Sequence, residues 1–148
     1  MYLDSAIIIK LLVREADSGW FNRELTGQSF ETSELAVTEV RSALLSKERA
    51  GHITPEERIA AGKKFFDLIA AELLLLLPLN RFVLERAGAI LLACHPRIPL
   101  RTLDALHVAT CDLYPSGTLA TMDGRMRSAC EQFGIALVPG KLEDLRIN

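Results

Sequence analysis

The sequence predicts a three-layer α/β domain, in which a parallel sheet carries helices on both faces. Two observations support this prediction. Short apolar runs typical of buried strands alternate with longer segments of helical periodicity, and 148 residues is the size of one ordinary domain. Strands that alternate with helices form βα units, whose right-handed crossovers make neighbouring strands parallel. We therefore expect one domain over residues 1–148.

The predicted strands are short apolar runs at positions 2–3, 35–37, 73–79, 119–120 and 135–138. Helical spacing marks the segments between them. One helix contains Val40, Ala43 and Leu44 at helical spacing and ends at Gly51. The next begins at residues 54–57, where Thr, Pro and Glu stand in the order of a capping box, and it continues through Ile69. Further helices are predicted over 81–94 and around Asp104 and Met126.

The composition is that of a globular chain, with 49% hydrophobic and 24% charged residues. The most apolar stretch, 73–77, is too short to span a membrane, and no basic leader precedes the first predicted strand, so we expect a cytoplasmic protein. Three cysteines without a CxxC pair argue against disulfides. The net charge of −2 provides no overall attraction to nucleic acid, so such binding needs a local basic patch.

Histidine and cysteine stand one helical turn apart at His107 and Cys111, a spacing that could offer two zinc ligands. No second ligand pair completes a tetrahedral site. The pattern therefore favours a buried cysteine beside a histidine that packs in a helix or forms a hydrogen bond.

Acidic residues follow three of the predicted strands. Asp4 follows the first strand, Glu39 follows the run that ends at Thr38, and Asp123 follows residues 119–122. Asp104 instead opens a helix among apolar neighbours, where Thr102 stands in position to cap that helix. Ligands of open α/β sheets bind beyond the carboxyl ends of the strands, so these acids are candidates for one crevice. Each acid taken singly is also explained as a helix cap.

Carboxylates are the candidate chemistry because the chain contains no phosphate-binding GxxxxGK[ST] or GxGxxG, no GxSxG and no HExxH. Several ionised carboxylates in one crevice repel one another, and a divalent cation compensates that repulsion. Mg²⁺ and Mn²⁺ prefer hard oxygen ligands. Such an ion can bind a phosphate oxygen and activate water.

Four stretches in this order resemble the PIN-domain nucleases and, within them, the VapC-type toxins of bacterial and archaeal toxin–antitoxin pairs. They are MYLDS at 1–5, SELAVTEV at 33–40, LRTLDALHVA at 100–109 and LATMD at 119–123. The resemblance covers the whole chain. It implies a five-stranded parallel sheet in an α/β/α fold, and one acidic pocket that binds Mg²⁺ or Mn²⁺ through Asp4, Glu39, Asp104 and Asp123.

The resemblance also implies an endoribonuclease that leaves 5′-phosphate and 3′-hydroxyl ends, with a metal-activated water as nucleophile. Three aspartates, at positions 4, 104 and 123, are then direct metal ligands, while Glu39 binds through water or orients the attacking water. Ser5 and Thr121 match hydroxyl positions of the family. Ser5 would orient Asp4 or contact the substrate phosphate, and Thr121 would hold the polar edge of the pocket, although capping explains both equally well.

The chain departs from the family pattern at two places. Ala6 stands where the family commonly has a small polar residue, so one hydrogen bond behind the pocket is not expected here. Met126 and Arg127 stand where some relatives add a further acid, which leaves one or two metal ions open.

A basic rim for RNA could come from seven residues: Arg41, Lys47, Arg49, Arg81, Arg101, Arg125 and Arg127. Arg101 and Arg125 are favoured because they adjoin proposed metal-site acids. By resemblance we further expect a homodimer and a small antitoxin whose C-terminal segment occupies the groove. Exposed apolar helix surface around residues 59–69 is the expected contact, although core packing explains the same pattern.

Three alternative functions share part of this pattern. A phosphoacceptor receiver domain also has acids at strand ends, and Lys141 resembles its lysine, but here Ser5 follows Asp4 where a receiver needs an acidic pair. A housekeeping PIN nuclease that processes RNA without an antitoxin is the closer alternative. A catalytically silent PIN fold used for binding is the third.

Overall fold

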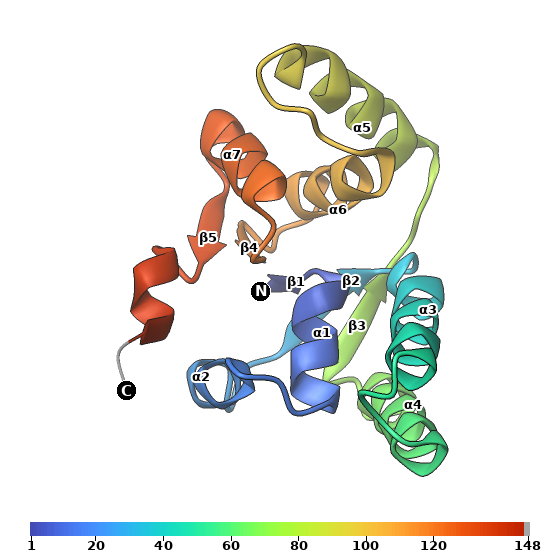
Figure 1. Cartoon of the computed structure of the whole chain (residues 1–148). Helices are drawn as coiled ribbons and strands as arrows, with labels where there is room; N and C mark the ends of the chain where they lie inside the picture. Colours follow the sequence, from blue (N-terminus) through green and yellow to red (C-terminus); the bar gives the residue numbers. More distant parts are fainter. Residues whose placement is uncertain (147–148) are drawn as a thin grey trace.

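The computed structural model describes residues 1–146 and contains one five-stranded parallel sheet in the order β3-β2-β1-β4-β5 (Figure 1). The strands are β1 (Tyr2–Leu3), β2 (Phe30–Ser33), β3 (Leu74–Leu77), β4 (Thr118–Ala120) and β5 (Ala136–Val138). The order reverses at β1, which is the first strand of the chain and the central one of the sheet. The predicted parallel sheet is therefore confirmed.

Seven α-helices connect the strands over the described residues. They are α1 (Ser5–Leu12), α2 (Ser18–Glu24), α3 (Ala36–Arg49), α4 (Pro55–Ala70), α5 (Arg81–Cys94), α6 (Thr102–Leu113) and α7 (Gly124–Phe133), followed by a 3₁₀ helix at Leu142–Arg146. Figure 1 shows α5, α6 and α7 on one face of the sheet and α1, α3 and α4 on the other. The three-layer α/β/α architecture is thus the predicted one. Residues 147–148 of the predicted domain lie outside the described part.

Side-chain alternation along β1 separates the two hydrophobic cores. Tyr2 packs in the core under α5, α6 and α7, and Leu3 packs in the core under α1, α3 and α4. Neighbouring β4 divides in the same way, with Leu119 in the first core and Ala120 in the second. Successive residues of a strand point to opposite faces, so a strand covered on both sides is apolar throughout.

The start of α4 has the predicted capping box. Thr54 Oγ1 accepts a hydrogen bond from the Glu57 N–H at 3.2 Å, and the Glu57 carboxylate accepts one from the Thr54 N–H at 2.8 Å. Pro55 occupies the first helical position, where its missing N–H costs nothing. The predicted helix over 81–94 is also present with these bounds.

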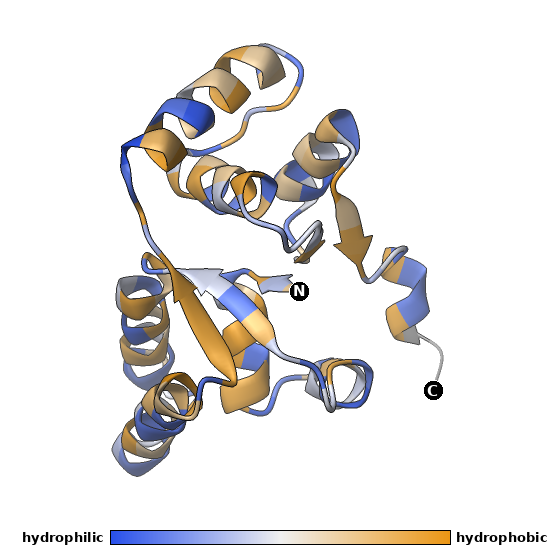
Figure 2. Ribbon diagram, turned by 180° about the vertical axis from the view of Figure 1, so that it is seen from behind, coloured by the Kyte–Doolittle hydropathy of each residue, from blue (hydrophilic) through white to orange (hydrophobic). Residues whose placement is uncertain are grey.

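One predicted strand is wrong. Residues 35–37 lie at the start of α3, whereas the strand is the preceding segment, Phe30–Ser33. The apolar run was too short to distinguish a strand from a buried helix turn. The true strand is mixed in polarity (Figure 2). Its Thr32 and Ser33 are fully buried, and their hydroxyls form hydrogen bonds with the backbone of Leu3 and Leu35. The helix α2 has no counterpart among the predicted elements.

No helix within residues 1–146 has the length and apolar character needed to cross a membrane. All three cysteines are buried and free of disulfides, as the odd count suggested.

Candidate functional site

The four predicted acids occupy the first turns or N-caps of four helices, which come from separate parts of the chain. Asp4 follows β1 and caps α1, while Asp123 follows β4 and caps α7. Glu39 and Asp104 lie in the first turns of α3 and α6. The cap interpretation is therefore correct for Asp4 and Asp123, and also for Asp104, whose carboxylate accepts the Arg101 N–H at the start of α6. Capping does not explain why these carboxylates lie near acids of other helices.

Asp4 and Glu39 form the first of two carboxylate pairs. Asp4 is only 4% exposed, and its Oδ1 accepts a hydrogen bond from the Ile7 N–H at 2.7 Å. Glu39 Oε2 accepts hydrogen bonds from Ser5 Oγ at 2.5 Å and lies 2.6 Å from His107 Nε2. Neutral donors and an imidazole therefore surround this pair.

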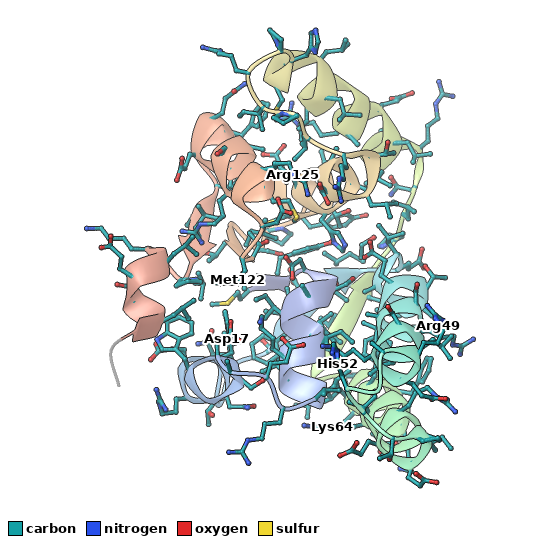
Figure 3. All side chains as sticks on the ribbon, viewed as in Figure 1. Asp17, Arg49, His52, Lys64, Met122 and Arg125 are labelled. Carbon is teal, nitrogen blue, oxygen red and sulfur yellow. The ribbon has the colours of Figure 1, made fainter. Side chains whose placement is uncertain are left out.

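Asp104 and Asp123 form the second pair, and an arginine lies between them. Arg125, at the start of α7 (Figure 3), donates from Nη2 to Asp123 Oδ2 at 2.9 Å, and the same nitrogen is 3.8 Å from Asp104 Oδ2. Asp123 Oδ1 also accepts the backbone N–H groups of Arg125 and Met126. A cation of the chain itself thus compensates part of the charge here.

Each pair contains one acid whose pKa is raised and one whose pKa is lowered. Burial raises the pKa of Asp4, and the Glu39 charge adds to that rise against the opposing Thr121 hydroxyl and Ile7 N–H. For Glu39, burial also raises the pKa, but the hydrogen bonds from His107 and from the Ser5 hydroxyl outweigh it and leave the pKa low.

The second pair divides in the same way. Burial and the neighbouring Asp123 charge raise the pKa of Asp104. The Arg125 guanidinium holds the pKa of Asp123 below its usual range. In each pair a neighbouring carboxylate thus adds to the effect of burial in raising the pKa of one acid, and a bound divalent cation would relieve this unfavourable interaction.

The donor set fits Mg²⁺ or Mn²⁺ in its chemistry, because these ions prefer carboxylate oxygens and keep several waters. Within residues 1–146, no three His, Cys, Asp or Glu side chains are close enough together to enclose a metal ion. The site is therefore two adjacent carboxylate pairs rather than a closed cage. An ion that retains water needs only one or two carboxylates.

The remaining predicted site residues lie at this edge of the sheet, with changed contacts. Ser5 donates to Glu39 and not to Asp4, the partner expected from the sequence. Thr121 is fully buried, and its Oγ1 accepts the Asp123 N–H at 3.1 Å, so it links β4 to the site. Arg101 is exposed at the N-cap of α6, where its backbone N–H donates to Asp104 Oδ2 at 3.3 Å. Thr102 is the first helical residue and not the cap.

Two residues have contacts that sequence reasoning did not find. His107 contacts both Glu39 and Tyr2, so it touches the site as well as the core, and its helical spacing from Asp104 was the available signal. Arg127 is 7% exposed and donates to the carbonyls of Thr121, Pro139 and Gly140. It holds the chain beside β4 and β5 and is not part of a basic rim.

Comparison with known proteins agrees with this architecture. The PIN domain family model matches residues 1–132. Ribonuclease VapC46 of Mycobacterium tuberculosis (strain ATCC 25618 / H37Rv) is 38% identical over 141 residues, which cover 93% of this chain and 95% of that protein. Ribonuclease VapC35 of M. tuberculosis (strain CDC 1551 / Oshkosh) is 27% identical over 150 residues, covering 95% and 98% of the two chains. An all-parallel α/β/α fold, the family match and these relatives together place the chain in the PIN-domain family, among the VapC-type ribonucleases.

Proposed function

We propose that this protein is a metal-dependent endoribonuclease and the toxin of a toxin–antitoxin pair. The observation that supports it most is the placing of four carboxylates from the starts of four helices in two pairs at one edge of the sheet. The relatives are named ribonucleases. We also propose that residues 1–148 form a single PIN domain in the cytoplasm.

Mg²⁺ or Mn²⁺ bound here would supply a Lewis acid for a phosphate oxygen and a water of lowered pKa as nucleophile. Asp4, Asp104 and Asp123 are the proposed direct ligands. Because no three acids within residues 1–146 already enclose an ion, direct binding by all three requires the second pair to move toward it. Glu39, tied at Oε2, binds through water or orients the attacking water. Thr121 holds the backbone of Asp123 in place through its hydroxyl.

Two arginines are proposed to hold RNA phosphates at this edge. Arg125 is 30% exposed and already touches both acids of the second pair, so its guanidinium is available beside the reacting group. Arg101 is exposed and precedes Asp104 on the same helix. Guanidinium groups suit this role because they bind phosphate in a bidentate manner.

We propose that the antitoxin binds in the groove between α3 and α4. A 360 Å³ pocket there is lined mainly by apolar side chains, among them Ile59 and Phe66, which are 60% and 44% exposed. Arg41 and Arg58 also line this pocket. Glu39 lies in the first turn of α3 and is followed directly by Val40 and Arg41, which line this pocket, so we propose that an antitoxin segment in the groove extends toward the carboxylates. A homodimer is proposed from the family resemblance, and light scattering of the purified protein tests it.

Cleavage of end-labelled RNA by the purified protein tests the proposed activity. We expect cleavage with Mg²⁺ or Mn²⁺, products with 5′-phosphate ends, and no cleavage in EDTA or by Asp104→Asn. Asp67→Asn is the matched control, because Asp67 is an exposed residue of α4 that pairs only with Lys63 in the neighbouring turn. Undiminished cleavage in EDTA would contradict the mechanism.

Two further observations separate the alternatives. Growth arrest on expression of the free protein, relieved by a small protein encoded next to it, supports the toxin role. Metal-dependent cleavage without such a partner favours a housekeeping nuclease. Binding of RNA without cleavage under all metal conditions favours a silent PIN fold.

A further inference from the structure

A chain of hydrogen bonds runs from the core to the site through His107. The Ser33 N–H donates to the Tyr2 hydroxyl at 3.1 Å, and that hydroxyl lies 2.7 Å from His107 Nδ1. His107 Nε2 lies 2.6 Å from Glu39 Oε2. Tyr2 is fully buried and His107 is 3% exposed. The chain thus connects the central strand, α6 and α3 without bulk solvent between them.

The Ser33 N–H, the first donor of these hydrogen bonds, indicates where the hydrogens of Tyr2 and His107 lie. The Tyr2 oxygen accepts the Ser33 N–H, so the phenolic hydrogen is free to point toward His107 Nδ1. The two threonines beside the phenol donate their own hydrogens elsewhere, Thr32 to the Leu3 carbonyl and Thr110 to the Leu106 carbonyl. Nδ1 is then the acceptor, and in the neutral ring Nε2 carries the hydrogen and donates it to Glu39.

The other tautomer of His107, with hydrogen on Nδ1, is unfavourable at the Glu39 carboxylate. If Nδ1 carried the only ring hydrogen, the lone pair of Nε2 would face Glu39 Oε2 at 2.6 Å, which is repulsive. The Tyr2 oxygen would then accept two hydrogen bonds and have no partner at His107 for its own hydrogen. The Nε2–H form satisfies every member of the chain.

Both hydrogen bonds to the Glu39 carboxylate fall on the same oxygen. Ser5 and His107 donate to Oε2, which leaves Oε1 as the oxygen available to the site. Because a carboxylate held at one oxygen by two donors cannot rotate freely, the direction of Oε1 is fixed before anything binds.

We infer that His107, with its tautomer set by Tyr2, is a positioning residue that fixes the Glu39 carboxylate for metal-dependent cleavage. The inference rests on the proposed function for the identity of the reaction, but the hydrogen-bond chain is a property of the free protein. It therefore has a test that does not need RNA or metal.

Long-range ¹H–¹⁵N spectra of the histidine side chains in the metal-free, full-length protein provide that test at neutral pH. The protein contains three histidines, and the signal of His107 is assigned by its loss in the His107→Gln variant. We expect hydrogen on Nε2 and none on Nδ1, as a hydrogen bond from the Tyr2 hydroxyl to Nδ1 requires. A ring protonated on Nδ1 alone, or on both nitrogens, would overturn the inference.

A pair of variants then tests the positioning role. Glutamine places its amide nitrogen near the position of Nε2 and can still donate to Glu39, whereas the shorter asparagine cannot reach it. We expect His107→Asn to lower kcat by about 10- to 100-fold with little change in KM, and to weaken Mn²⁺ binding, while His107→Gln recovers most of both.

His52→Asn is the control for the substitution itself, since His52 is exposed after α3 and far from the site in Figure 3. Thermal unfolding confirms that each variant is folded. Equal kcat and Mn²⁺ affinity in His107→Asn and the wild type would overturn the positioning role. A different result would contradict the proposed function: the wild-type protein would neither bind Mn²⁺ nor cleave RNA. The imidazole spectra would still show in that case whether His107 donates to Glu39.

Discussion

The two carboxylate pairs of the site are held in different ways. Donors without a permanent charge hold the Asp4–Glu39 pair: a backbone N–H, the Ser5 hydroxyl and the His107 imidazole. The Asp104–Asp123 pair is held by the Arg125 cation, whose side chain is 30% exposed. The first pair is consequently built into the packed fold, and the second is held by a long side chain that solvent reaches. We expect the first pair to be rigid and the second to adjust when metal or RNA binds.

The largest effects are expected when one carboxylate of each pair is replaced. We expect Asp4→Asn and Asp123→Asn both to slow cleavage by more than about a hundredfold, because even groups that only support metal ligands contribute 10- to 100-fold. Raised Mn²⁺ should recover part of the activity of Asp123→Asn but not of Asp4→Asn, whose surroundings cannot rearrange. Single-turnover cleavage against Mn²⁺ concentration measures this, and the same metal response in both variants would contradict the distinction.

Loss of the cation between the second pair is the next test. Arg125→Ala should bind Mn²⁺ several-fold more tightly in the absence of RNA, because the ion no longer competes with a guanidinium for Asp123. RNA binding should weaken, and the slope of log K against log salt should fall by about one. Calorimetry and filter binding measure the two effects.

Arg86→Ala is the matched control, since Arg86 is 33% exposed and pairs with Asp112, which is not an acid of the site. Unchanged Mn²⁺ affinity in Arg125→Ala would show that the guanidinium does not occupy the place of the ion.

The sequence predicted the fold, and it singled out the four acids as site candidates. It did not predict that different kinds of groups hold the two carboxylate pairs. The fold follows from local patterns, such as the capping box at residues 54–57 and the two-sided burial of β1. Glu39 was selected for the wrong reason, as the end of a strand at 35–37, and it reaches the site because α3 begins just beyond β2. Thr32 and Ser33 concealed that strand, because buried hydroxyls satisfied by hydrogen bonds look like loop residues in a sequence.

The hydrogen bonds that position Glu39 join residues far apart in the chain. His107 and Glu39 are 68 positions apart, and Tyr2 and His107 are 105 apart. No spacing rule predicts such pairs, since only the fold brings side chains of β1, α3 and α6 together at this edge of the sheet. The same holds for Arg127, whose burial depends on the carbonyls that follow β4 and β5.

Stability of the metal-free protein should distinguish the acids within the second pair. The pKa of Asp104 is raised from 3.8, so this group stabilises the fold fully below its unfolded pKa, and that contribution is lost as pH rises through the folded pKa. The pKa of Asp123 is lowered, so its contribution is present above the unfolded pKa and is lost as pH falls.

At pH 7 in EDTA we therefore expect Asp104→Asn to gain about 0.5–2 kcal/mol in unfolding free energy, as substitutions of strained functional groups commonly do. Asp123→Asn should lose stability. Denaturant unfolding measures both, with Asp67→Asn unchanged. Destabilisation by both substitutions would mean that repulsion does not dominate at Asp104.

The smallest expected effect concerns the second donor to Glu39. Ser5→Ala removes one of the two hydrogen bonds at Oε2 and leaves the bond from His107. If the imidazole already fixes the carboxylate, cleavage should slow by only about threefold to tenfold, since a neutral hydrogen bond contributes about 0.5–1.5 kcal/mol. Ser5→Thr, which keeps the hydroxyl, should stay near the wild-type rate. A loss in Ser5→Ala as large as that in His107→Asn would make the serine an equal partner, and the rigidity of the first pair would then depend on a hydroxyl at the start of α1 as much as on the buried chain from Tyr2.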